Sequence, residues 1–232
     1  TRRSSDLPPN ILKMLKSPCP FWPGKKVEET HSLILLPATL NGEPFNLNKL
    51  EIILRDLREE IRLEYQIREE MKEKFGKQAA SQSYWFLIAK NTFPESDHKT
   101  YECQSAFINI YNIERSAPYY LPRILEVVTF LSLKYIQTKA LTFFRHDFTT
   151  CEEQWSPDFS FIGWLFFRNF VESRFGSSVG MTSSRMKKGM PIIIIGNQHF
   201  NCLEPGINTD CLTSNFHRHI FLDGIAPVKR FT

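Results

Sequence analysis

The segment Leu121 to Gln137 reads LPRILEVVTFLSLKYIQ, and its composition decides how the rest of the chain can fold. Pro122 stands in the first turn of a predicted helix, where the missing N–H of proline costs nothing. The charged and amide side chains form only a narrow stripe on that helix: Arg123, Glu126, Lys134 and Gln137. A helix that is apolar on nearly every side is stable only when it is buried. The segment therefore predicts a helix at the centre of a domain.

Short apolar runs elsewhere in the chain predict strands that pack around this helix. They are residues 32–36 (SLILL), 84–89 (YWFLIA), 140–145 (ALTFFR) and 191–195 (PIIII). Residues 219–222 and 225–231 flank Asp223-Gly224 and predict a closing hairpin, whose second strand lies at a sheet edge because Pro227 has no N–H to donate. The predicted fold class is mixed α/β (α+β), with one central sheet of about five to six strands flanked by helices.

Other segments have the composition of helices, turns or loops. Residues 11–15 predict a short helix between prolines, and a helix that starts near Asp97 is expected to carry Cys103 on or near its inner face. Residues 48–75 predict one long helix that stops at Gly76 and has i,i+4 charge pairs on a solvated face. Asn41-Gly42 predicts a turn, and residues 177–189, rich in serine, glycine and basic residues, predict a surface loop.

The length and charge of the chain limit the classes of protein to which it can belong. Its 232 residues suit one domain over residues 17–232, preceded by an extension with a short helix over residues 1–16. The 29 basic and 25 acidic residues give a net charge of +4, which is too mild to indicate a polyanionic partner. No apolar run approaches the ~20 residues of a membrane-spanning helix, and the start lacks the apolar core of a signal peptide. Five widely spaced cysteines indicate reduced thiols and a cytoplasmic environment.

Aromatic and basic residues are interleaved over residues 159–188, a mixture that can bind single-stranded nucleic acid. Phenylalanine is chiefly a residue of cores, so a packed interior or a protein-binding patch explains the segment better. Nucleic acid is therefore not the expected partner. The chain also lacks the glycine-rich loops of the commonest nucleotide-binding motifs.

Four metal-ligating side chains lie close together near the C-terminus: Cys202, Cys211, His217 and His219. Thiolate and imidazole groups can close a tetrahedral zinc site. The spacing is irregular and lacks the tight Cys-x2-Cys knuckle of zinc modules, so scattered loop residues are the alternative explanation. Zinc is the one cofactor that the sequence suggests.

A cysteine nucleophile with a histidine base is a second candidate. Cys151 or Cys202 would supply the thiol and His146, His199 or His217 the base. Asn197 or Asp223 would orient the imidazole. Neither thiol stands at a helix start, where its pKa would be lowered. The neighbouring acids Glu152 and Glu153 are expected to be solvated on an exposed turn.

Several stretches resemble an expanded family of uncharacterised proteins from environmental, amoeba-infecting chlamydiae of the Parachlamydia and Protochlamydia type. They are residues 17–27 (SPCPFWPGKKV), 30–31 (TH), 33–37 (LILLP), 41–45 (NGEPF), 83–85 (SYW), 94–96 (PES) and 99–101 (KTY), followed by 120–122 (YLP) and 149–152 (TTCE). None of these motifs is a catalytic signature. The chain departs from the family pattern after residue 154, where residues 155–189 form an insertion that precedes Ile195-Gly196-Asn197.

The resemblance implies a bacterial protein of the cytoplasm, or one that is secreted into a eukaryotic host cell as an effector. Family-level site candidates within the matching stretches are Cys19, Thr30, His31 and Asn41. Cys19 between two prolines also fits a packed turn, and His31 before a buried strand also fits a structural histidine.

The sequence thus favours a non-enzymatic protein-interaction module with a protein partner. Its contact surface would be the charged helix over residues 48–75 or the aromatic and basic insertion. The alternatives are a Cys/His-dependent hydrolase or transferase, with Cys151, His146, Cys19 and His31 as candidate catalytic residues, and a zinc-binding domain.

Overall fold

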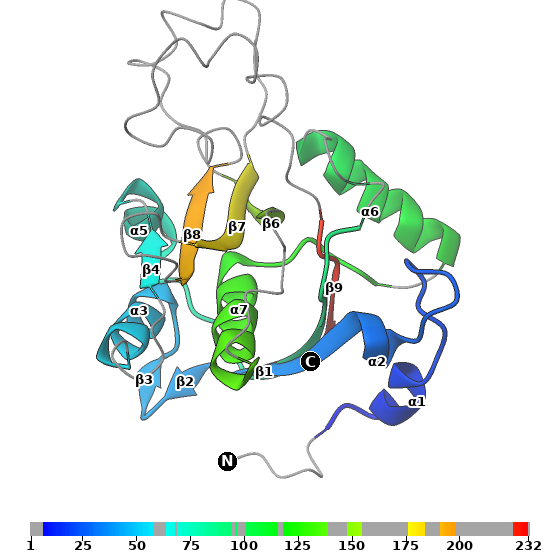
Figure 1. The fold of residues 1–232 in the computed structure, drawn as a ribbon, viewed down its shortest axis with the longest axis horizontal. Coiled ribbons are helices and arrows are strands. Elements are labelled where there is room, and N and C mark those ends of the chain that lie inside the picture. The colour runs from blue at the N-terminus through cyan, green and yellow to red at the C-terminus, as the bar shows by residue number, and fades with distance from the viewer. Residues whose placement is uncertain are drawn as a thin grey trace, which may run out of the picture.

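Helix α7, Ile124–Thr138, lies at the centre of the fold, as its sequence predicts (Figure 1). The computed structural model describes residues 7–57, 64–67, 69–93, 96, 101–115, 118–138, 148–154, 176–183, 191–197 and 225–231. Within these residues, α7 packs against a three-stranded sheet and also lies against strands of a four-stranded sheet. Contact with both sheets explains why apolar residues surround almost the whole helix.

The three-stranded sheet is antiparallel and has the order β1-β5-β9. Its strands are β1 (His31–Leu36), β5 (Tyr84–Ala89) and β9 (Val228–Phe231), so the strands predicted at 32–36 and 84–89 are confirmed. Strand β5 lies in the middle, with Phe86 in the core that contains α7 and Leu87 in the core on the opposite face. Burial on both faces accounts for the uninterrupted apolar run of β5. Strand β9 follows Pro227 at a sheet edge, as predicted. The first strand of the predicted hairpin, residues 219–222, lies outside the described residues.

Helices α1 (Ile11–Leu15), α2 (Val27–Thr30) and α6 (Tyr101–Arg115) lie on the side of this sheet away from α7 (Figure 1). An aromatic core joins them: the ring of Phe21 stacks on that of Tyr111 at 4.4 Å and meets that of Tyr119 edge-on at 4.8 Å. The short helix predicted at 11–15 is confirmed. Cys103 is exposed, so its predicted position on the inner face is wrong: among the described side chains of α6, Gln104, Ile108 and Tyr111 are buried.

The four-stranded sheet has the order β4-β8-β7-β6, with β4 parallel to β8 and the other pairs antiparallel. Its strands are β4 (Glu64–Ile67), β6 (Phe148–Gln154), β7 (Gly176–Ser183) and β8 (Pro191–Asn197). The strand predicted at 191–195 is confirmed. The surface loop predicted at 177–189 is wrong over residues 177–183, because these residues belong to β7 and pair with β8. The strand predicted at 140–145 lies outside the described residues.

A two-stranded hairpin completes the described sheets. Strands β2 (Thr39–Leu40) and β3 (Glu43–Pro44) are joined by Asn41-Gly42, whose φ angles of 54° and 83° suit a tight hairpin turn. The mixed α+β class is confirmed. One central sheet of five to six strands is not confirmed, since the described strands form sheets of three, two and four strands.

The long helix predicted over residues 48–75 is wrong. Helix α3 (Leu47–Asp56) begins at the Asn46 cap, whose side chain accepts from the Lys49 N–H at 2.9 Å, and helix α5 (Glu69–Phe75) ends before Gly76 as expected. Strand β4 intervenes because it pairs with β8, a strand more than a hundred residues away in the sequence. Such long-range pairing overrides the local helical spacing. The charge pairing also changes, since Glu51 forms its ion pair with Lys72 of α5 at 2.8 Å.

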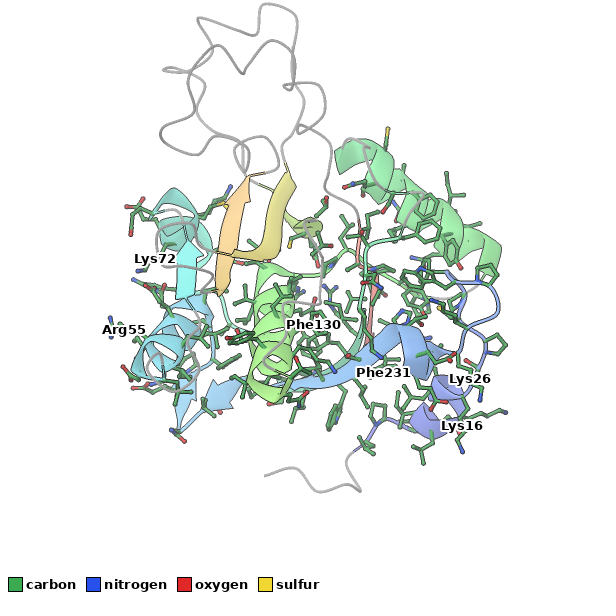
Figure 2. The ribbon with its side chains drawn as sticks, viewed as in Figure 1. Lys16, Lys26, Arg55, Lys72, Phe130 and Phe231 are labelled. Carbon is green, nitrogen blue, oxygen red and sulfur yellow. The ribbon has the colours of Figure 1, made fainter. Side chains whose placement is uncertain are left out.

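Replacement of Phe130 by alanine tests the central role of α7. The Phe130 side chain, labelled in Figure 2, belongs to α7 and is fully buried. Phe130→Ala therefore leaves a cavity and should lower the free energy of unfolding by about 3–5 kcal/mol. Leu133, on the same helix, is 39% exposed, and Leu133→Ala should cost under about 1 kcal/mol. Urea denaturation followed by circular dichroism measures both. Equal losses in the two variants would contradict a central α7.

Candidate functional site

A groove of about 520 Å³ runs along the outer edge of strand β1. Residues 31–35 of β1 line it, together with Leu133, Lys134 and Gln137 from the C-terminal half of α7. Trp85, Lys90 and Glu28 complete the lining. The groove therefore joins a strand edge, one apolar side chain of α7 and two lysines.

The hydrogen-bond pattern of β1 shows which backbone groups face this groove. The Lys90 N–H donates to the Thr30 carbonyl at 2.8 Å, and Ser32 stands opposite Ile88 in the antiparallel register. Because hydrogen-bonded positions alternate along an antiparallel pair, Ser32 and Ile34 bond to β5 while Leu33 and Leu35 point their N–H and C=O groups away from it. No strand pairs with this side of β1 among the described residues.

His31 lies at the start of β1 and is almost fully buried. Its Nδ1 is 2.9 Å from Thr30 Oγ1, and that hydroxyl has the Lys26 and Val27 carbonyls as acceptors at 3.1 and 3.3 Å. This arrangement favours the tautomer in which Nδ1–H donates to Thr30, and Nε2 is then left buried without a hydrogen-bond partner. Burial, and next the nearby Lys90 charge, lower the pKa of His31 to about 4, so the ring is neutral.

A network of charged side chains lies at the other end of α7. Glu126, with no exposed surface, accepts from Arg230 at 2.7 Å and 3.0 Å, from the Tyr84 hydroxyl at 2.8 Å and from the Arg123 N–H at 2.7 Å. Arg230 also donates to Glu152 at 2.8 Å. Glu126 and Glu152 raise the pKa of Arg230 against the effect of burial. The network joins α7 to β5, β6 and β9, and its groups are paired with one another, which fits a structural role.

Glu153 occupies a different environment from its neighbour Glu152. Its carboxylate accepts from the Ile124 N–H at 3.0 Å, at the first turn of α7. Burial raises the pKa of Glu153 to about 7, an effect that the bond from Ile124 opposes. The expectation that both acids are solvated on an exposed turn is therefore wrong for Glu153, because β6 carries it against the start of α7.

The structure brings few of the predicted catalytic residues together. Cys151 has no exposed surface and its thiol lies 3.7 Å from the Thr149 carbonyl, whereas His146, the proposed base, lies outside the described residues. Cys19 belongs to the aromatic core that contains Phe21, and the His31 ring lies 6.3 Å from the Phe21 ring between centroids. The hydrogen bonds of the described residues include none between the Cys19 thiol and the His31 ring. Cys19 instead lies in a turn closed by its N–H bond to the Lys25 carbonyl at 2.7 Å.

The predicted zinc ligands Cys202, Cys211, His217 and His219 all lie outside the described residues, as do His199 and Asp223. Over the part of the chain that the structure describes, no three side chains among His, Cys, Asp and Glu are placed to share a metal ion. The zinc site stays a prediction, and so does the thiol nucleophile.

Sequence reasoning identified His31 but missed the other residues of the groove, among them Ser32, Leu33, Leu35, Trp85, Lys90 and Lys134. One signal was available, since Lys134 and Gln137 belong to the narrow polar stripe of a helix that is otherwise apolar. No local signal shows that β1 is an edge strand, because its composition resembles that of the central strand β5.

Comparisons of the chain with protein-family models, with curated proteins and with solved structures found no match. In the described parts of the chain, no helix combines the length and the apolar character needed to cross a membrane.

Removal of the Arg230 side chain tests the network at Glu126. Arg230→Met leaves a fully buried carboxylate without its cation and should lower the free energy of unfolding by about 3–5 kcal/mol. Lys229→Met is a matched control, because Lys229 is partly exposed, lies over the Tyr119 ring and forms no ion pair with the described residues. Its loss should cost under about 1 kcal/mol. Chemical denaturation measures both, and a mild effect of Arg230→Met would show that Glu126 is solvated.

The pKa values of Glu153 and His31 predict opposite pH dependences of stability. The pKa of Glu153 is raised in the folded protein, so ionisation of this carboxyl group lowers the free energy of unfolding as pH rises from about 4.5 through about 7. The pKa of His31 is lowered, so stability is lost as pH falls from 6.5 towards about 4. Glu153→Gln should match the wild type near pH 4 and exceed its stability by about 1–3 kcal/mol near pH 8. Thermal melts across this range measure the difference, and a constant difference would refute the raised pKa.

Proposed function

We propose that the protein is a protein-interaction module that binds an extended segment of a partner along the outer edge of β1. The observation that carries the proposal is the row of outward N–H and C=O groups of Leu33 and Leu35, two residues that line a groove of about 520 Å³. An extended peptide that enters this groove adds a strand to the sheet, a common mode of peptide recognition.

The chemistry of the groove suits such a segment. Leu33 and Leu35 offer two donors and two acceptors, and each bond formed contributes about 0.5–1.5 kcal/mol net. Leu133, 39% exposed on α7, and Trp85 add apolar surface that a partner's side chains can cover. Exposed sheet edges are liable to pair with other chains, so an edge beside a preformed groove favours a binding role.

This surface differs from those expected from the sequence. Residues 48–75 do not form the single charged helix that would be a contact surface. The aromatic and basic segment lies outside the described residues over 159–175, and there the expectation is untested. The edge of β1 is the surface for which the described residues supply geometry.

We further propose, from the resemblance of residues 17–27 and the other stretches, that this module acts in a chlamydia-like bacterium. Its setting would be the bacterial cytoplasm or, as an effector, the host cell. The resemblance supports an interaction role because no motif that carries it is a catalytic signature.

Leu33→Pro tests the strand-addition mode. The Leu33 N–H faces the groove, so proline removes a donor to the partner and leaves the β1–β5 hydrogen bonds in place. Peptides selected from a displayed random library should bind the wild type, protect the Leu33 and Leu35 amides from hydrogen exchange, and lose about tenfold or more in affinity on Leu33→Pro.

Leu33→Thr is the matched control, because it changes the side chain but keeps the N–H, and it should retain most of the affinity. Circular dichroism establishes that both variants are folded. A library that yields no binder, or binders that leave the two amides unprotected, would count against this function.

A further inference from the structure

The side of the groove next to α7 has a definite chemistry. Residues opposite one another in an antiparallel pair share a face, so Ser32 lies on the face of Ile88, which packs in the core with α7. Lys90 follows the last residue of β5 and lines the same groove as Ser32. Lys134 and Gln137 of α7 line the groove there. Two cations and two neutral polar side chains are thus gathered on one side.

Lys90 is held in position by backbone groups. Its ammonium group donates to the Glu28 and Glu29 carbonyls, at 2.9 and 3.0 Å. Within the described residues it forms no ion pair with a carboxylate. Burial lowers the pKa of Lys90, and the charge of Lys134 lowers it further, whereas the Glu29 carboxylate raises it, so the two cations lie near enough to repel each other. An anion between them would relieve this repulsion.

Ser32 supplies an independent observation. The residue is only 7% exposed, and its hydroxyl is buried without a hydrogen-bond partner although it lines the groove. A buried hydroxyl without a partner costs about 1–3 kcal/mol, and native structures contain few of them. A ligand atom that accepts from Ser32 Oγ would remove this cost.

We propose that the groove binds a partner segment through an aspartate or glutamate side chain, whose carboxylate lies between Lys90 and Lys134 and accepts from Ser32. This inference rests on the proposed strand addition and names the class of segment. Successive side chains of a bound strand alternate between faces, so the acidic residue faces α7 and its neighbours face Leu35 and Trp85. The partner would therefore alternate acidic or polar residues with apolar ones.

The charges around the groove support this choice. Glu28 also lines the groove, but its carboxylate lies 3.9 Å from Lys26, which partly neutralises it. Within the described residues, Lys90 and Lys134 are the cations that line the groove. Partly desolvated, charge-assisted bonds are stronger than neutral ones, so one carboxylate can set the register of the bound segment.

The probes are synthetic peptides about nine residues long that alternate valine and threonine, are blocked at both ends, and carry one glutamate at successive positions. Matched peptides carry glutamine or lysine at the same positions, and one neutral peptide has a free C-terminal carboxylate. Fluorescence anisotropy at low salt gives the affinities. The best glutamate peptide should bind about tenfold more tightly than its glutamine counterpart.

Protein variants assign the effect to the groove. Lys134→Glu should abolish the preference for glutamate and favour the lysine peptide. Lys13→Glu, an equal charge change on the exposed face of α1, should preserve the preference. Ser32→Ala should reduce the preference with little change in binding of the glutamine peptide.

The outcomes separate this inference from the function on which it rests. Equal binding of glutamate and glutamine peptides, with Leu33 and Leu35 amides protected, would overturn the carboxylate site and leave strand addition intact. A preference for the free C-terminus alone would also overturn it. Failure of every peptide to bind or to protect these amides would overturn both.

Discussion

Burial of α7 against two sheets is the constraint on which the described fold depends. Ile124, Phe130 and Leu131 have no exposed surface, and a helix of this composition has no stable place at a surface. The three-stranded sheet packs against α7 through Ile34, Phe86 and Val228, which come from the first, middle and last strands of the sheet. These strands are far apart in sequence, so the central helix and the sheet require each other. The aromatic core around Phe21 then covers the opposite face of the same sheet.

The one buried charge of α7 fixes the position of the C-terminal strand. Glu126 is fully buried, and Arg230 of β9 meets it with two hydrogen bonds. Replacing such a pair with apolar residues often leaves stability unchanged, so the net contribution of the pair to stability is small. An incorrect register of β9 on β5 would leave Glu126 without its cation. The network thereby links correct pairing of the chain end to formation of the core.

The sequence predicts those parts of the fold that depend on local patterns. The apolar run of α7, the strands at 84–89 and 191–195 and the Asn41-Gly42 turn follow from composition and spacing. Residues 64–67 show the limit, because their pairing with 192–195 depends on contacts that no local pattern records. The groove was beyond prediction for the same reason: the runs of β1 and β5 look alike, and only the strand order makes β1 an edge. His31 was identified from its motif, but its neutral ring depends on burial and on Lys90, which comes from another part of the chain.

Lysines beside a strand edge have two physical explanations, and the surroundings of Lys90 distinguish them. Natural proteins place lysine at exposed edges to prevent pairing with other chains, and a lysine with that role extends into water, where its charge is fully hydrated. Lys90 is instead partly buried, pinned by the Glu28 and Glu29 carbonyls and near Lys134. This placement lowers its pKa, which means that the fold holds the cation at a cost. A lysine whose role is only to repel other strands gains nothing from such a placement. A lysine that binds an anionic group gains from it, because its ammonium group is already in position before the anion binds. The unpartnered Ser32 hydroxyl in the same groove favours the second explanation.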